Sequence, residues 1–102
     1  MWIQGGVSQF DGDLKLGTAG NGLYVKEGTN ATMGTATMVG GTVVVNTTKV
    51  TANSRIFLAN NTNGGTLGSL SISARTAGTS FTISSTNVLD TSTVAWIIFE
   101  PS

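Results

Sequence analysis

The first residues of this chain that could do chemistry are two carboxylates near its N-terminus. Asp11 and Asp13 flank a single glycine, and clustered carboxylate oxygens are the ligands that calcium prefers. The rest of the calcium-loop pattern is missing. We therefore interpret Asp11-Gly12-Asp13 as a turn with solvated carboxylates, and we assign the chain no metal and no cofactor.

Groups for acid–base or nucleophilic catalysis are scarce. The sequence contains no histidine and no cysteine, which removes the commonest general base and every thiolate nucleophile or zinc ligand. A serine activated by Lys15, Lys26 or Lys49 stays open, but no spacing singles one out. The glycine-rich segments 17–22 and 64–68 lack the lysine of a phosphate-binding loop. We therefore expect that the protein is not an enzyme.

Two arginines stand at the ends of expected strands. Arg55 opens segment 55–59 and Arg75 closes segment 69–75, with Asp90 and Glu100 as candidate partners. Ion pairs between them would fix loops or a subunit contact. The alternative is an exposed charge worth less than about 1 kcal/mol, and both interpretations stay open.

The element that must organise these groups is the segment from Thr93 to Glu100, the longest nearly unbroken apolar run. Trp96 and Ile98 point to one face of such a strand, and Ile97 and Phe99 point to the other. A strand that is apolar on both faces is central in a sandwich or pressed against another copy of the chain. We therefore place Ile97 and Phe99 at a subunit contact.

From Gly34 onward the chain reads as short strands separated by turns, with no helical period. Turns every eight to twelve residues are typical of a sandwich or barrel. We predict an all-β fold of seven to nine strands, a small antiparallel β-sandwich that is jelly-roll-like. The expected inward residues are Leu23, Val25, Val43, Val45, Ile56, Leu58, Leu70, Ile72, Phe81, Ile83, Trp96 and Ile98, and Ala74 continues the pattern of Leu70 and Ile72.

The residues at the N-terminus, before the predicted strands, are expected to stand outside the sandwich. Segment 1–12 carries scattered apolar residues without amphipathic partners, so we expect an extended arm that docks on another surface, a frayed terminus being the alternative. The domain then spans 13–102, and 13–33 is expected to form a hairpin that links the two. The candidate contact residues of the arm are Trp2, Ile3, Val7 and Phe10.

Composition limits the partners. Charged residues make up 10% of the 102 residues, and five basic groups balance five acidic ones. With no basic field we expect no nucleic acid, and with no apolar run long enough to span a bilayer we expect no membrane partner. So few charges give little protection against self-association. The N-terminus lacks a signal-peptide pattern, which predicts folding in a cytoplasm.

Three ordered blocks carry a family resemblance: VTANSRIFL at 50–58, SARTAGTSFTI at 73–83 and DTSTVAWIIFEP at 90–101. They resemble a β-rich module of tailed-phage virion proteins, found at the C-terminus of tail fibres and spikes. The segment TAGNGLYVKEG at 18–28 resembles the stretch that precedes this module. The resemblance implies a bacteriophage structural protein that assembles as a homotrimer.

The resemblance leaves two locations on the virion open. Because the module stands here behind a short arm, we favour a capsid decoration (cement) or head-fibre protein that docks onto the major capsid protein or another virion protein. The alternative is a tail-fibre or spike tip that binds a host receptor or a surface glycan through Trp2, Tyr24 or the loop 60–66. In either case we expect assembly in the cytoplasm of the host bacterium.

Overall fold

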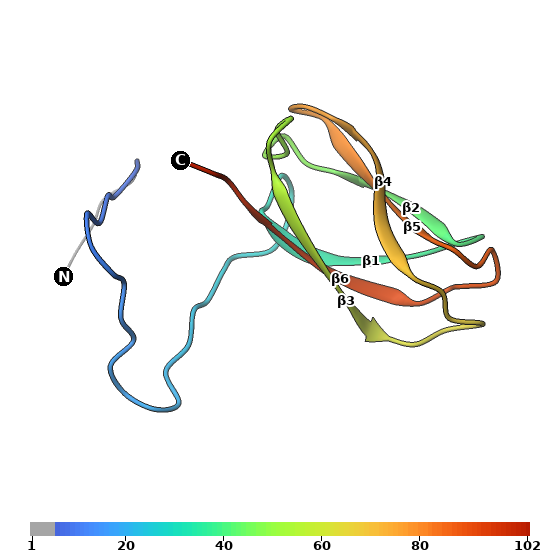
Figure 1. Ribbon diagram of the computed structural model, residues 1–102, viewed down its shortest axis with the longest axis horizontal. Coiled ribbons are helices and arrows are strands. Elements are labelled where there is room, and N and C mark those ends of the chain that lie inside the picture. Colours follow the sequence, from blue (N-terminus) through green and yellow to red (C-terminus); the bar gives the residue numbers. More distant parts are fainter. Residues whose placement is uncertain (1–5) are drawn as a thin grey trace.

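The structure, a computed structural model, describes residues 6–102, which form six β-strands and no helix (Figure 1). The strands are β1 (Met33–Thr37), β2 (Thr42–Asn46), β3 (Arg55–Thr62), β4 (Leu70–Thr76), β5 (Ser80–Ser85) and β6 (Thr93–Phe99). This number is smaller than the seven to nine that the turn spacing predicts, because residues 13–32 form no strand. The same residues 6–102 contain no helix with the length and hydropathy needed to cross a bilayer.

Two three-stranded antiparallel sheets pack face to face, in the orders β1-β6-β3 and β2-β5-β4. The all-β antiparallel sandwich is therefore confirmed, although it is smaller than an eight-stranded jelly roll. The central strands are β5 and β6. The apolar segment from Thr93 to Phe99 thus lies in the middle of its sheet, as its two apolar faces indicate.

The core lies between the two central strands. Phe81 of β5 meets Trp96 of β6 edge to face, with ring centroids 5.2 Å apart, a geometry that aromatic pairs prefer. Ten of the twelve residues expected to face inward belong to this core or pack against it. Met38, Val50 and Val94 complete it.

Two of the expected positions are wrong. Leu23 is 64% exposed because its segment forms no strand and leaves the sandwich with the arm. Ala74 is exposed because the register of β4 against β5 shifts between Ile72 and Ala74, and this bulge breaks the period of two. Val25, in the same strand-free segment as Leu23, is only half-buried.

The connection from β1 to β2 carries the chain from one sheet to the other through a tight turn. Gly40 and Gly41 both have positive φ, at 65° and 78°, as a two-residue turn of this type requires. A Cβ on Gly41 would also collide with the backbone of Asn87. Position 41 is therefore restricted to glycine, which lets the loop 86–92 pack closely against the turn.

A buried carboxylate joins three loops at this end of the sandwich. Asp90 accepts hydrogen bonds from the backbone N–H groups of Gly68 (3.1 Å) and Ser92 (3.0 Å), while its own carbonyl accepts one from Gly41 (3.1 Å). The Ser92 hydroxyl above all, and that of Ser85, lower the pKa of the carboxyl to about 2 although burial opposes this. Of the two candidate partners of the arginines that the sequence left open, Asp90 is instead held by these loop groups, which satisfy its charge.

Candidate functional site

The outer face of sheet β1-β6-β3 is the most unusual surface of the molecule. Residues directly opposite each other in antiparallel strands share a face, and the register sets Met33 and Phe57 on either side of Ile97. Ala59 likewise faces Ala95, and Arg55 faces Phe99 at the edge. We call the set Met33, Phe57, Ala59, Ala95, Ile97 and Phe99 the apolar face.

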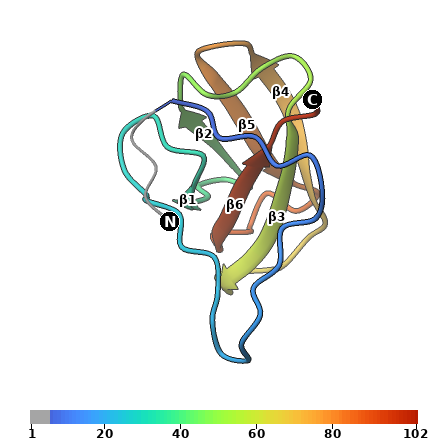
Figure 2. The same ribbon diagram turned by 90° about the vertical axis from the view of Figure 1, so that its left-hand side faces the viewer.

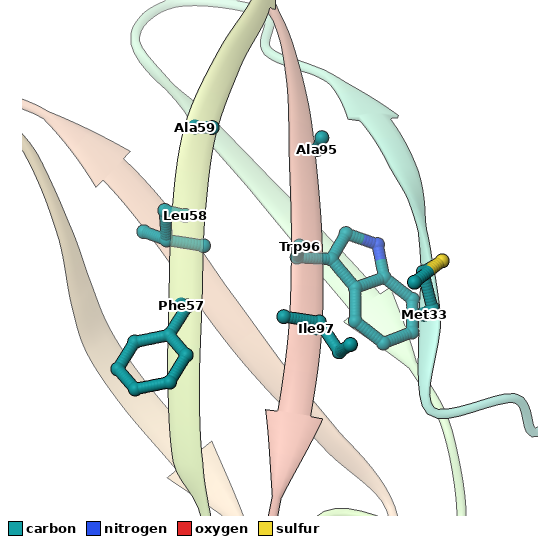
Figure 3. Close-up of a pocket in the computed structure, with 7 residues that line it drawn as sticks. All are labelled: Met33, Phe57, Leu58, Ala59, Ala95, Trp96 and Ile97. Carbon is teal, nitrogen blue, oxygen red and sulfur yellow. The ribbon is translucent and has the colours of Figure 1, made fainter. Parts of the chain in front are cut away.

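The centre of the apolar face is hollow. A depression of about 210 Å³ lies there, and no charged side chain lines it. Figure 3 shows Phe57 and Ile97 standing from neighbouring strands beside it, and Met33 on the far side of β6. The lining residues are Met33, Phe57, Leu58, Ala59, Ala95, Trp96 and Ile97.

Two phenylalanine rings project from this surface into solvent. Phe57 is 59% exposed and Phe99 is 47% exposed, and their centroids lie 5.5 Å apart at a tilt of 56°. Large apolar residues gathered on one sheet face mark an interaction site more often than isolated ones do. The arrangement favours contact with another apolar surface.

The outer face of the other sheet has the opposite character. On β2, β4 and β5, the hydroxyl groups of Thr42 and Ser73 both contact that of Ser84, at 3.4 and 2.7 Å. Val44 is the large apolar side chain exposed on these strands, at 57%. The outer face of sheet β1-β6-β3 is therefore suited to contact with another protein, and the outer face of sheet β2-β5-β4 is suited to contact with water.

The predicted arginine contacts meet at the start of β3, around Glu100. The Glu100 carboxylate accepts hydrogen bonds from the hydroxyl groups of Ser54 and Thr51, the second at 2.5 Å. These donors, Ser54 first, and the positive charges of Arg55 and Arg75 lower the pKa of Glu100. The two arginines therefore lie close enough to Glu100 for their charges to lower its pKa.

Each arginine donates its hydrogen bond to the backbone. Arg55 Nη1 lies 2.5 Å from the carbonyl of Asn53, and Arg75 Nη1 lies 2.7 Å from that of Ser54. Arg75 belongs to β4 and Ser54 directly precedes β3, so this bond ties the two sheets together. Arg75 consequently has a structural role at the end of the sandwich, while Arg55 borders the apolar face.

The residues expected at a contact do not all come together. Ile97, Phe99 and Arg55 share one face, whereas Val7 and Phe10 stand on the arm and are exposed. Trp2 and Ile3 lie outside the described residues. Their roles in assembly remain predictions.

Sequence reasoning missed Phe57 and Met33 as members of this surface. The signal for Phe57 was present, because Arg55-Ile56-Phe57-Leu58-Ala59 is apolar on both faces in the same way as the strand that contains Trp96. Met33 carried no such signal, since it opens a strand of glycine, alanine and threonine.

The possible metal ligands lie in the strand-free segment before β1. Asp11 accepts a hydrogen bond from the side chain of Gln9 at 2.6 Å, and both Asp11 and Asp13 are exposed. Within residues 6–102 no three acidic side chains are clustered in a way that could hold a metal ion.

Comparison with known families gives one match. A family model described as the K1 capsule-specific polysaccharide lyase, C-terminal domain, matches residues 30–99. The match begins three residues before β1 and ends with β6, so it covers the whole sandwich. It supports a module of the phage tail-fibre and tail-spike type and gives no support to capsid decoration. No curated protein matches the chain.

Proposed function

The chain belongs to the family of C-terminal domains of K1 capsule-specific polysaccharide lyases, and from this premise we propose that it is an assembly module of a bacteriophage tail fibre or tail spike. In this role it forms a homotrimer in which each apolar face is covered by neighbouring copies. The observation that carries the proposal is the exposure of Phe57 and Phe99 on a face that belongs to the matched sandwich.

The two outer faces support this assembly. A closed ring of identical subunits needs one surface that contacts its neighbours and another that remains in water. The apolar face suits the first requirement, and the hydroxyl-bearing face around Ser84 suits the second. With a net charge of zero, copies do not repel one another on approach.

The tail location replaces the capsid location as our preferred proposal. The family is named for lyases that act on a capsule polysaccharide, and such an activity is useful where a virion meets the surface of its host. We propose that the module described here supports and positions such machinery and does not itself cleave polysaccharide.

Two measurements test the proposal. Size-exclusion chromatography with light scattering is expected to give about 31 kDa, three times the chain mass of 10.4 kDa. Gold-labelled antibodies are expected to mark the tails of intact virions by electron microscopy. A stable monomer, or label confined to the capsid shell, would contradict the proposal.

A second candidate function is recognition of capsule polysaccharide by the same module. The name of the family supports this ligand class, and Tyr24 offers a ring that is 94% exposed, as sugar-stacking residues often are. Titration of the protein with capsule oligosaccharides should then perturb tyrosine fluorescence, and Tyr24→Ala should abolish that response. No saturable response from the intact protein would rule this function out.

A further inference from the structure

We propose that residues 6–27 of one copy, here called the arm because the strand-free segment after residue 12 continues it, lie across the apolar face of a neighbouring copy, so that the subunits exchange their arms. The inference rests on the proposed homo-oligomer and names the occupant of its apolar face. It is carried by four features of the described residues: the apolar side chains of the arm, the anchoring of its base, the size of the face and the distribution of charge.

The arm carries apolar side chains that no part of its own sandwich covers. Val7 is 98% exposed, and Phe10, Leu14 and Leu16 are each at least half exposed. The hydrogen bonds recorded for residues 6–27 stay within the arm, as between Asn21 and Thr18. Figure 1 shows the arm standing to one side of the sandwich, and Figure 2, viewed from that side, shows it passing in front of β6 and β3 without joining them.

The shape of the molecule agrees with an arm that stands apart. The radius of gyration is 15.7 Å, whereas a compact chain of this length has a value of about 13 Å. An isolated copy therefore leaves its arm and its apolar face uncovered at the same time.

The base of the arm is fixed in direction by the sandwich. Asn30 has a positive φ of 55°, and its side chain accepts a hydrogen bond from the backbone N–H of Thr48. The carbonyl of Ala31 accepts one from the Thr47 hydroxyl at 2.8 Å, and that of Thr32 accepts one from the N–H of Ile98 at 2.8 Å. These bonds set the path along which the chain leaves the edge of β1.

The apolar face alone is too small for a stable contact. Three strands about 4.8 Å apart and about 23 Å long present a surface of roughly 300 Å², whereas a stable interface buries about 800 Å² on each partner. Four apolar side chains of an arm add about 100 Å² each. In an exchange each copy buries its face against one neighbour and its arm against another, so it buries more surface than the face alone could provide.

Charge also favours this pairing. Arg55 borders the apolar face, opposite Phe99, and the arm carries Asp11 and Asp13 close to Phe10. A carboxylate of the arm can therefore approach the guanidinium group while Phe10 enters the hollow. Such complementarity selects one placement among those that the apolar contact allows.

Cysteine cross-linking tests the inference cleanly because the chain has no cysteine of its own. Two mixtures are prepared, one of size-tagged Phe10→Cys chains with untagged Phe57→Cys chains and one of size-tagged Leu16→Cys chains with untagged Phe57→Cys chains. Each mixture is refolded and then oxidised. We expect a disulfide-linked product of mixed size with at least one arm position. Val44→Cys is the matched control, since Val44 is as exposed as Phe57 but lies on the opposite sheet, and we expect no mixed product with it.

Other outcomes would overturn the inference. If neither arm position gives a mixed product while light scattering still shows a trimer, arm exchange fails and the proposed function stands. If Phe57→Cys chains link only to each other, the faces meet directly. If the double variant Phe10→Cys/Phe57→Cys links within one chain and an excess of wild-type chains leaves that product unchanged, the arm covers its own face. A monomer in light scattering removes the proposed function as well.

Discussion

At the scale of single residues, Trp96 is the largest side chain of the buried core. It is 6% exposed, contacts Phe81 and lies beneath Gly34 of β1, where a Cβ would come within 3.0 Å of the indole. Removal of a large buried ring costs its transfer free energy and leaves a cavity.

We expect Trp96→Ala to lower the free energy of unfolding by about 3–5 kcal/mol, as measured by urea denaturation at one fixed protein concentration. Val44→Ala is the control, because this side chain is 57% exposed on the opposite sheet and its loss should cost much less. Equal losses from the two variants would show that Trp96 is not the centre of the core.

The carboxyl group of Asp90 makes stability depend on pH. Its pKa is about 2 in the folded protein, below the ordinary value of 3.8, so the unfolded chain takes up the proton first as pH falls. The stability that Asp90 contributes is therefore complete above pH 3.8 and is lost as pH falls toward about 2. Glu100, whose pKa is also lowered, acts in the same direction.

We expect the urea midpoint to fall across this acidic range in the wild type and to change less in Asp90→Asn, which should also be less stable at neutral pH because an amide cannot accept both backbone hydrogen bonds. If both proteins follow the same curve, the hydrogen bonds of Asp90 do not contribute to stability.

At the scale of elements, glycines decide how closely the loops approach. Gly65 and Gly78 both have positive φ, at 61° and 72°. A Cβ on Gly65 would collide with the carbonyl oxygen of Leu89, whereas a Cβ on Gly78 would meet open space.

We therefore expect Gly78→Ala to cost about 1–2 kcal/mol, the penalty of a left-handed conformation alone, and Gly65→Ala to cost at least twice as much. Thermal unfolding followed by circular dichroism measures both. Similar melting temperatures for the two variants would mean that the loop 86–92 moves freely away from residue 65.

The sequence allowed the prediction of those elements whose side chains alternate against a buried sheet. Ile56, Phe81 and Ile83 lie where a period of two places them, because a shift by one residue would expose the whole set. Leu23 was misplaced because a segment of three or four alternating residues carries the same signal without any partner strand. The bulge at β4 could not be predicted, since it depends on pairing with β5.

The candidate site was predicted in part for a related reason. Ile97 and Phe99 were identifiable from a strand that is apolar on both faces. The partners of Glu100 were not, because Thr51 and Ser54 lie about fifty residues away in the chain and only the fold brings them together.

At the scale of the whole molecule, an apolar contact between copies has its own response to salt. Ion pairs at a surface weaken as salt rises, whereas apolar burial is not screened. We expect the proposed trimer to persist in about 1 M sodium chloride, well above the salt at which surface charges are screened, when it is analysed by light scattering. Dissociation at that salt concentration would show that charges hold the copies together.

Substitution on either outer face should separate assembly from folding. We expect Phe57→Glu to convert the trimer to a folded monomer, because a charge would be buried between copies. Val44→Glu, a change at equal exposure on the hydroxyl-bearing sheet, should remain trimeric. Light scattering and circular dichroism together distinguish loss of assembly from loss of fold, and a trimeric Phe57→Glu would place the contact elsewhere.

The position of β6 has a consequence for synthesis. It is the last strand of the sandwich, yet both β1 and β3 hydrogen-bond to it and not to each other. Until the ribosome has released Thr93–Phe99, neither of those strands has a neighbour in its sheet, and about sixty residues separate β1 from its partner. In the nascent chain β1 and β3 therefore stay unpaired until β6 is made. A stop codon ahead of Thr93 would leave both strands unpaired permanently, in a product that cellular proteases can recognise and remove.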